Sequence, residues 1–136
     1  VYLGIKDKRI AVNHFCATHD IRLESVACIF DDINDLSMAK ICSVRSLVRR
    51  SASPLFTEYV RNNRLCDYIS GNVSGRHVVR EISELLLGLI GLFETVVTSR
   101  VAIDGQYRHY FNQRQSLSTH MYKQEGDAVV AASEKT

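Results

Sequence analysis

The chain has 136 residues, 46% of them hydrophobic and 24% charged, and its net charge of +2 says little about a partner. This length holds one domain with a buried core and leaves little room for a second. The lack of Trp and the single Pro argue against a turn-rich β-sandwich. The longest apolar run, residues 85–93, is too short for a membrane span, which takes about 20 residues.

Apolar side chains recur at steps of three and four along the first hundred residues, which is helical spacing. We expect helices over residues 5–18, 21–30, 36–50, 54–62 and 76–100. Pro54 fits the first turn of its helix, where its missing N–H donor costs nothing. Between the last two helices lie a short apolar anchor at residues 65–69 and a flexible loop at residues 71–75.

The segment 76–100 has the longest apolar pattern in the chain. Gly88 and Gly91 interrupt it, and each costs about 1 kcal/mol relative to Ala inside a helix. The close approach of another helix is the simplest reason to keep them. Glu81 and Glu84 lie one turn apart on the same face. They form either a pair able to hold Mg²⁺, which prefers oxygen ligands, or a polar stripe facing solvent.

After Arg100 the pattern weakens, with a turn at Asp104 and Gly105 and a polar, aromatic stretch up to residue 115. The last twenty residues are mostly polar and are expected to order only on a partner. Helical periods without strand alternation predict an all-α domain. We therefore expect a helical domain over residues 1–111 and a polar C-terminal tail over residues 112–136.

The four cysteines contain no CxxC pair and sit in apolar stretches, so we expect buried free thiols. That fits a reducing compartment. No secretory signal is visible, and the chain begins with Val1 rather than Met, which leaves open the removal of an organelle-targeting peptide. His14, Cys16 and His19 are spaced so that a helix scatters them, which favours a core or interface role over a metal site.

Six cations lie within residues 40–64 against one acid, Glu58. Such a concentrated basic set suits a phosphate backbone, although a solvated helix face is an equally good interpretation. We predict that these residues bind RNA: Lys40, Arg45, Arg49, Arg50, Arg61 and Arg64.

Three stretches, taken in order, resemble the ribonuclease III endonuclease domain. Residues 1–5 match only the apolar centre of the family signature, and residues 43–49 with the anchor that follows are similar to its second feature. Residues 81–90, with sequence EISELLLGLI, align without a gap to the D-x-[FV]-E-A-L-[IL]-G-A-[IL] motif. The resemblance covers residues 1–98 and implies an all-α, ribonuclease III-like helical bundle that dimerises.

The family cleaves double-stranded RNA with four carboxylates and Mg²⁺ at each active site. Two of these acids would fall on Val1 and Ile5, which are apolar here, and one on Glu81, where the motif has Asp; Glu84 is kept. Since metal-assisted hydrolysis needs carboxylates to hold the ions, the resemblance predicts a non-enzyme with vestigial glutamates and no cofactor. It also implies close helix packing, within the domain or at a dimer surface, at Leu3, Gly4, Leu85 and Gly88.

The resemblance thus predicts an inactive module that pairs with another ribonuclease III-like chain and binds structured or double-stranded RNA. A mitochondrial ribonucleoprotein is the expected setting: the large ribosomal subunit, its assembly intermediate, or an RNA-processing or editing complex. Otherwise we expect an intracellular protein without membrane contact. The alternatives are a Mg²⁺-dependent nuclease completed by partner or upstream acids, and a helical scaffold without RNA contact.

Overall fold

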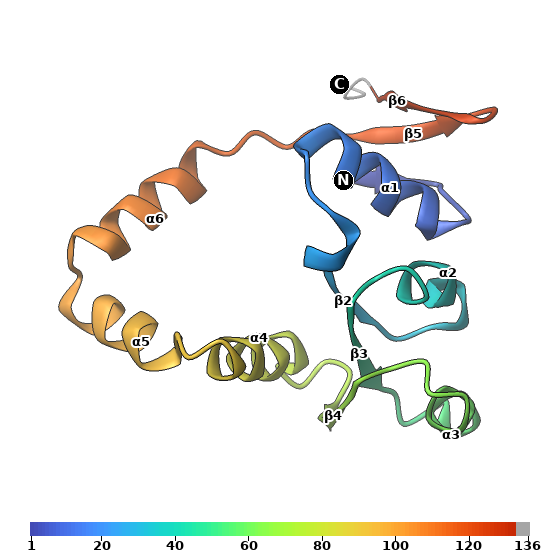
Figure 1. The fold of residues 1–136 in the computed structure, drawn as a ribbon, viewed down its shortest axis with the longest axis horizontal. Coiled ribbons are helices and arrows are strands. Elements are labelled where there is room, and N and C mark those ends of the chain that lie inside the picture. Colours follow the sequence, from blue (N-terminus) through green and yellow to red (C-terminus); the bar gives the residue numbers. More distant parts are fainter. Residues whose placement is uncertain (133–136) are drawn as a thin grey trace. The chain divides into compact units, whose positions relative to one another are not determined.

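The computed structural model describes residues 1–132, which form a mixed α/β structure (Figure 1). The prediction of an all-α, ribonuclease III-like bundle is wrong, because these residues include six strands in two three-stranded sheets. The chain divides into two compact units. Unit 1 contains Val1–Val79 and the described residues from His120 on, and unit 2 contains Arg80–Thr119.

The main sheet of unit 1 is wholly parallel, with the strand order β2-β3-β4. Its strands are β2 (Ala27–Phe30), β3 (Val44–Arg49) and β4 (Tyr68–Val73). Phe30 is paired with Leu47, and Leu47 with Ile69. A parallel strand covered on both faces is a short apolar run rather than an alternating one. Periodicity cannot separate such a run from a buried helix, which is why the predicted helix at 21–30 is wrong, since β2 has the sequence ACIF. The predicted helix at 36–50 is wrong as well, although β3, with the sequence VRSLVR, is not such a run.

Short helices connect the strands of this sheet. The four-residue α2 (Leu36–Ala39) follows a 3₁₀ turn at Ile33–Asp35 and joins β2 to β3. The helix α3 (Pro54–Asn62) joins β3 to β4 and confirms its predicted range, with Pro54 in the first turn. The helix α1 (Lys8–His19), preceded by the capping residue Asp7, confirms the predicted N-terminal helix except for its first residues.

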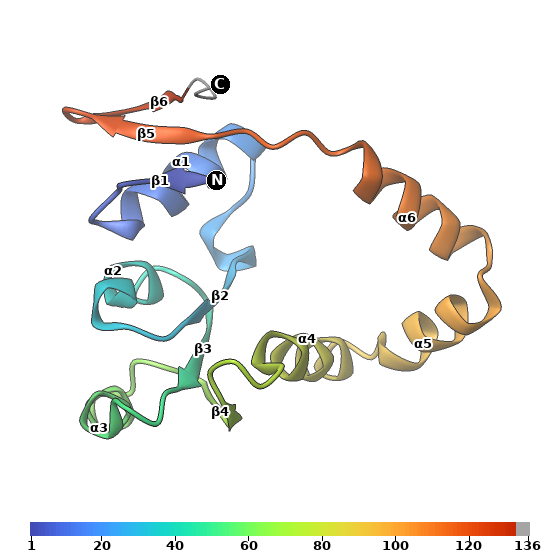
Figure 2. The same ribbon diagram turned by 180° about the vertical axis from the view of Figure 1, so that it is seen from behind.

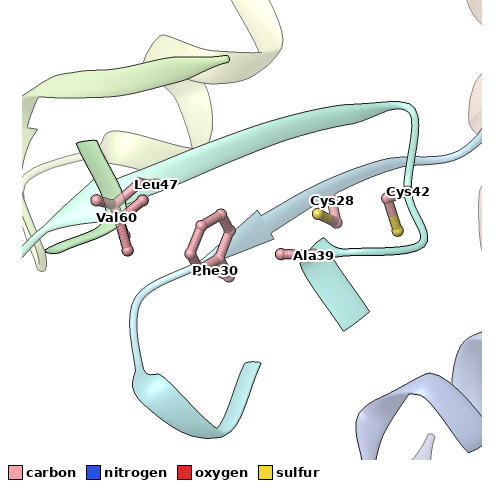
Figure 3. Close-up of a cluster of buried hydrophobic side chains, with 6 residues drawn as sticks. All are labelled: Cys28, Phe30, Ala39, Cys42, Leu47 and Val60. Atoms are coloured by element: carbon pink, nitrogen blue, oxygen red, sulfur yellow. The ribbon is translucent and has the colours of Figure 1, made fainter. Parts of the chain in front are cut away.

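The core of unit 1 lies between the parallel sheet and the helices α2 and α3 (Figure 3). Leu47 and Val60 are fully buried, and Phe30 is 2% exposed. All four cysteines are free, as predicted; Cys66 is only partly buried and the other three are buried. The cluster consists of Cys28, Phe30, Ala39, Cys42, Leu47 and Val60.

The second sheet joins the two ends of the chain (Figure 2). The strand β1 (Tyr2–Leu3) runs parallel to β5 (Tyr122–Glu125), which pairs antiparallel with β6 (Ala128–Ala131). Tyr2 stacks on Tyr122 at a ring-centre distance of 5.2 Å, and its hydroxyl lies 2.8 Å from His14 Nδ1. The predicted tail therefore contains a hairpin that packs on the N-terminus. Residues 133–136 of that tail lie outside the described residues.

Unit 2 consists of helical segments only. The helix α4 (Val78–Leu89) begins at the end of unit 1, and α5 (Phe93–Ala102) and α6 (Gly105–Ser116) follow. The predicted single helix over 76–100 is broken between α4 and α5, whose axes are bent by 111°. Within residues 1–132 no single helix has the length and apolarity to cross a membrane, although α4 and α5 taken together pass that test of length and composition.

Gly91 explains the break between α4 and α5. It has a φ of +73°, the left-handed conformation that ends many helices and that glycine adopts without steric cost. The Gly91 N–H donates to the Gly88 carbonyl at 3.0 Å, and the Leu92 N–H donates to the Leu87 carbonyl at 2.9 Å. This pair of bonds is the Schellman motif of a helix C-terminus. Gly91 is therefore a helix end and not a site of close helix packing.

Candidate anion-binding site at the carboxyl edge of the parallel sheet

The carboxyl ends of β2, β3 and β4 meet at one edge because the three strands are parallel. Open α/β sheets bind ligands outside this edge at the point where the strand order reverses. The consecutive order β2-β3-β4 contains no reversal, so the residues that line the edge decide whether it can bind one. The residues that follow the strands are polar: Asp31 and Asp32 after β2, Arg50 and Ser51 after β3, and Ser74 after β4. The topology therefore brings acidic, basic and hydroxyl groups to one place.

A pocket of about 490 Å³ lies at this edge. Its volume is within the range of small-molecule sites, about 300–1,000 Å³. Three guanidinium groups face one carboxylate in its lining, so the pocket carries net positive charge. The lining residues are Arg49, Arg50, Ser51, Pro54, Thr57, Glu58, Arg61 and Val73.

The three arginines of the pocket differ in how much of their hydrogen-bonding capacity is used. Arg49 is fixed, because its Nη2 donates to the Gly71 carbonyl at 2.5 Å and its backbone N–H donates to Ser70 Oγ at 2.9 Å. Arg50 Nε lies 3.5 Å from Asp31 Oδ2 in a half-exposed ion pair. Arg61 makes no salt bridge to any residue in the described part of the chain. Because a guanidinium has five N–H donors, Arg50 and Arg61 can both receive an anion.

The N-terminus of α3 also borders this pocket. Pro54 at the first helical position and Thr57 in the first turn both line it. The N-terminal end of a helix carries the positive end of the helix dipole and favours bound anions. The helix end and the arginines therefore both favour an anion in the pocket.

The acids after β2 have different roles. Asp35 is 4% exposed, forms an ion pair with Lys8, and accepts from the backbone N–H groups of Asp31 and Asp32 at 3.2 and 3.3 Å. It therefore fixes the loop. Asp32 Oδ1 accepts from the Ile33 N–H at 2.6 Å and caps the turn that follows. Asp31 is the acid that contacts an arginine of the pocket.

No group of three or more His, Cys, Asp or Glu side chains within residues 1–132 is arranged to hold a metal ion. Neither Asp31 nor Asp32 lines the pocket: Asp31 contacts its Arg50, and Asp32 caps the turn that follows β2. Mg²⁺ in proteins is commonly held by one or two carboxylates together with waters and the phosphate groups of a ligand. The Asp31 carboxylate is thus the one beside the pocket that could share a cation with a bound phosphate.

The structure divides the six cations predicted to bind RNA. Arg49, Arg50 and Arg61 come together in the pocket, whereas Lys40, Arg45 and Arg64 do not line it. Lys40 follows α2 and is exposed, and the Arg64 carbonyl accepts from Arg45 Nη1 at 3.3 Å.

Arg45 is held at the amino end of β3 by Asp67. Its Nη2 donates to Asp67 Oδ1 at 2.7 Å, and its backbone N–H and Nε donate to Oδ2 at 2.8 and 3.1 Å. The hydrogen bond with Asp67 raises the pKa of Arg45 and lowers that of Asp67. Counting charges over residues 40–64 missed both Asp31 and Asp67, since each lies outside that window and is paired through the tertiary structure.

The two glutamates of the nuclease-like motif lie on α4. Glu84 Oε1 accepts from Arg80 Nε at 2.7 Å, a pairing at i and i+4 along the helix. Glu81 is half-buried. At the positions of the lost acids, Ile5 is half-buried and Val1 is exposed, with the Val1 amino group donating to the His120 carbonyl.

The predicted packing positions show no close approach within the described chain. A Cβ atom added at Gly88 would meet no other atom within 4 Å, and the same holds at Gly4, whose φ of +66° places it in a turn. Leu3 belongs to β1 and is exposed, and Leu85 is half-buried on α4. The packing reason expected for Gly88 is not found among residues 1–132.

The three residues His14, Cys16 and His19 pack within unit 1. His14 contacts the rings of Tyr2 and Tyr122, and Cys16 is 6% exposed. The His19 ring lies 4.6 Å from that of Phe15. Of the core or interface role predicted for this group, the core part is confirmed for the buried Cys16, while His14 is half-buried and His19 is exposed.

No protein-family model matches the chain, and no curated protein matches it either. The chain is similar to one crystal structure, that of the hypothetical protein XCC2798 from Xanthomonas campestris, with a TM-score of 0.58 and 23% sequence identity. The match covers 70% of this chain and 48% of the Xanthomonas protein, so the chain spans about half the length of that protein. At this identity the likeness shows a shared fold and carries no function.

Proposed function

We propose that the carboxyl edge of the parallel sheet binds a phosphorylated small molecule, whose phosphate group is held by Arg50 and Arg61. The observation that supports this most directly is the arginine-lined pocket at the carboxyl edge of the parallel sheet. Both side chains retain unused N–H donors, and the planar guanidinium matches two phosphate oxygens at once.

Three further features favour a phosphate over a single carboxylate. The first turn of α3 adds its dipole, the Ser51 side chain adds a hydroxyl group, and Arg49 adds a third positive charge. A phosphate monoester carries close to two negative charges at neutral pH and has three terminal oxygens. Its charge and its number of acceptors are therefore well suited to this lining.

Asp31 extends the proposal to a divalent cation. In the absence of a ligand Asp31 balances Arg50. A phosphate that binds Arg50 in place of Asp31 would leave the Asp31 carboxylate facing another anion. Mg²⁺ bound between the carboxylate and the phosphate would relieve that repulsion. We therefore expect Mg²⁺ to strengthen binding of the phosphorylated ligand while binding weakly on its own.

Calorimetric titration of the full chain tests this proposal. The probes are inorganic phosphate, a sugar phosphate and a nucleoside monophosphate, each with and without Mg²⁺. Arg50→Gln and Arg61→Gln should each weaken binding roughly tenfold to a hundredfold, because a hydrogen bond to a charged group contributes about 1.5–3 kcal/mol. Arg22→Gln is the matched control, since Arg22 is 81% exposed and lies outside the pocket. Equal affinity in all three variants would refute the assignment.

RNA carries the same phosphate chemistry, and a second arm of the experiment separates the two ligands. Affinity for double-stranded RNA is measured between about 50 and 200 mM salt, where each phosphate contact steepens the salt dependence. An extended RNA site would include Lys40 and Arg64, so Lys40→Gln and Arg64→Gln would reduce the slope. A small-molecule site leaves both variants unchanged.

The other roles inferred from the ribonuclease III resemblance depended on an all-α bundle, which this chain does not have. The inactive nuclease module, the ribonuclease III-like partner, the ribonucleoprotein and the mitochondrial location stay predictions. Measuring phosphate release in the same titrations with Mg²⁺ would show whether binding at this edge leads to hydrolysis.

A further inference from the structure

One wall of the pocket at the sheet edge is a single face of α3. The four residues that α3 contributes to the lining are spaced at i, i+3, i+4 and i+7, which places them on one side of a helix. They are Pro54, Thr57, Glu58 and Arg61. The opposite wall consists of residues at the carboxyl ends of β3 and β4, among them Arg50 and Val73. Glu58 therefore faces the same space as the arginines.

Glu58 is the only acid among the described residues that line this pocket, and it forms no salt bridge within residues 1–132. Arg61 lies three positions further along α3, where side chains of opposite charge can pair on the helix surface. No such pair forms between Glu58 and Arg61. Two opposite charges on one wall are thus both available to a ligand.

This pattern of charges indicates the chemistry of the ligand. A carboxylate beside an anion site repels a bound phosphate, and a positive group on the ligand offsets that repulsion by attraction. A phosphorylated amine has both groups, because its phosphate matches the arginines and its ammonium carries three N–H donors for a carboxylate. A phosphorylated acid would instead place a second anion against Glu58.

The spacing of the two charges suits a short ligand. Side chains at i and i+3 of a helix have Cβ atoms about 5–6 Å apart. Since a C–C bond is about 1.5 Å long, a body of about two to four carbon atoms bridges them. Pro54 and Val73 add apolar surface to the same lining, which such a body can contact.

We propose that Glu58 selects a small phosphorylated amine, with its phosphate on Arg50 and Arg61 and its ammonium on the Glu58 carboxylate. This inference rests on the phosphate binding proposed above and adds the class of ligand to it. The headgroup of phosphatidylethanolamine has the same two groups, but its phosphate is a diester with one negative charge. A monoester carries close to two charges and suits a lining with three arginines better, so we assign the site to the free monoester.

Calorimetric titration of the full chain with three matched probes tests this assignment. O-phosphoethanolamine, 2-hydroxyethyl phosphate and phosphoglycolate share a phosphate and two carbon atoms, and they carry an ammonium, a hydroxyl and a carboxylate group, respectively. The wild type should bind the ammonium probe roughly fivefold more tightly than the hydroxyl probe, because exposed ion pairs contribute up to about this factor.

Substitutions at Glu58 should change this preference without a buried defect, because Glu58 is exposed. Glu58→Gln should lower the ratio of the two affinities to about one or below, since the amide carries no charge. Glu58→Lys should make phosphoglycolate bind more tightly than O-phosphoethanolamine. Glu24→Gln is the matched control and should leave the ratio unchanged, since Glu24 is 76% exposed and lies outside the pocket.

The same titrations distinguish the class of ligand from phosphate binding itself. If Arg61→Gln weakens all three probes but Glu58→Gln leaves the ratio unchanged, the amine is wrong and the phosphate site stands. If no probe binds, both proposals are refuted. Vesicles of phosphatidylcholine with and without phosphatidylethanolamine form the last arm. Binding that requires phosphatidylethanolamine, without binding of free O-phosphoethanolamine, would assign the site to a lipid headgroup and refute the free ligand.

Discussion

Replacing Asp67 with asparagine tests whether Asp67 holds Arg45 in an ion pair and so separates it from the other cations of residues 40–64. Asp67 accepts three hydrogen bonds from Arg45, one from the backbone N–H and two from the guanidinium. The asparagine side chain keeps the shape of the carboxylate and loses its charge. Since Asp67 is 44% exposed and Arg45 25%, solvent screens much of the attraction. We expect a loss of about 1 kcal/mol, the upper end of the range for exposed ion pairs, because the contact is bidentate.

A double-mutant cycle isolates the Arg45–Asp67 pair. The free energies of unfolding of the wild type, Asp67→Asn, Arg45→Met and the double variant are measured by urea denaturation with circular dichroism. The coupling energy should be about 0.5–1 kcal/mol. The pair Arg22–Glu24, separated by 3.5 Å with both side chains more than 75% exposed, is the control and should couple by close to zero. A coupling for Arg45–Asp67 no larger than the control would refute the assignment.

The pH dependence of the same pair has a definite sign. The hydrogen bond from Arg45 lowers the pKa of Asp67 in the folded state below the usual value of 3.8. Its contribution to stability is therefore complete above that value and is lost as the pH falls through the lowered folded-state pKa. The difference in stability between the wild type and Asp67→Asn should be constant at neutral pH and shrink below about pH 4. A difference that grows on acidification would contradict this reasoning.

Three further predictions test the fold. Gly91→Ala should destabilise the chain by about 1 kcal/mol, because Gly91 has a left-handed backbone conformation. Gly88→Ala should be neutral or stabilising, since its added Cβ meets nothing within 4 Å. Thermal unfolding compares the two variants, and a more stable Gly91→Ala than Gly88→Ala would contradict the helix-end assignment. Leu47→Ala should cost about 2–5 kcal/mol in urea denaturation, because Leu47 is fully buried at the centre of the sheet. Cys66 is partly buried whereas the other three cysteines are buried, and burial raises the pKa of the Cys28 thiol to about 12, so an alkylating agent followed by mass spectrometry should modify Cys66 first.

The helix α3 and most of α1 could be predicted from the sequence, whereas the helix expected over residues 36–50 was wrong. Pro54 at the first position sets the start of α3, and α3 was predicted residue for residue. The segment 36–50 carries similar apolar spacing, yet it forms a single helical turn followed by β3, whose sequence VRSLVR is neither an apolar run nor a strict alternation. Its strand state depends on pairing with β2 and β4, which no local pattern shows.

The all-α fold implied by the resemblance to ribonuclease III was wrong for a related reason. Its most specific stretch, residues 81–90, lies on α4, where apolar side chains recur at helical spacing beside Glu81 and Glu84. Any helix with one buried and one solvated face needs this pattern. The motif therefore carried information about a local helix and none about the fold around it.

The sequence by itself determined α3 and most of α1, the free thiols and the excess of arginine between residues 40 and 64. Only the tertiary structure decided which arginines form a site, because a parallel sheet brings together groups that follow different strands. Asp31 and Arg50 are 19 positions apart in the sequence, yet Asp31 Oδ2 lies 3.5 Å from Arg50 Nε. At the other end of β3, Asp67 forms an ion pair with Arg45. Charge counted along the chain cannot show such pairings, since electrostatic attraction acts over distance in space and not over separation in sequence.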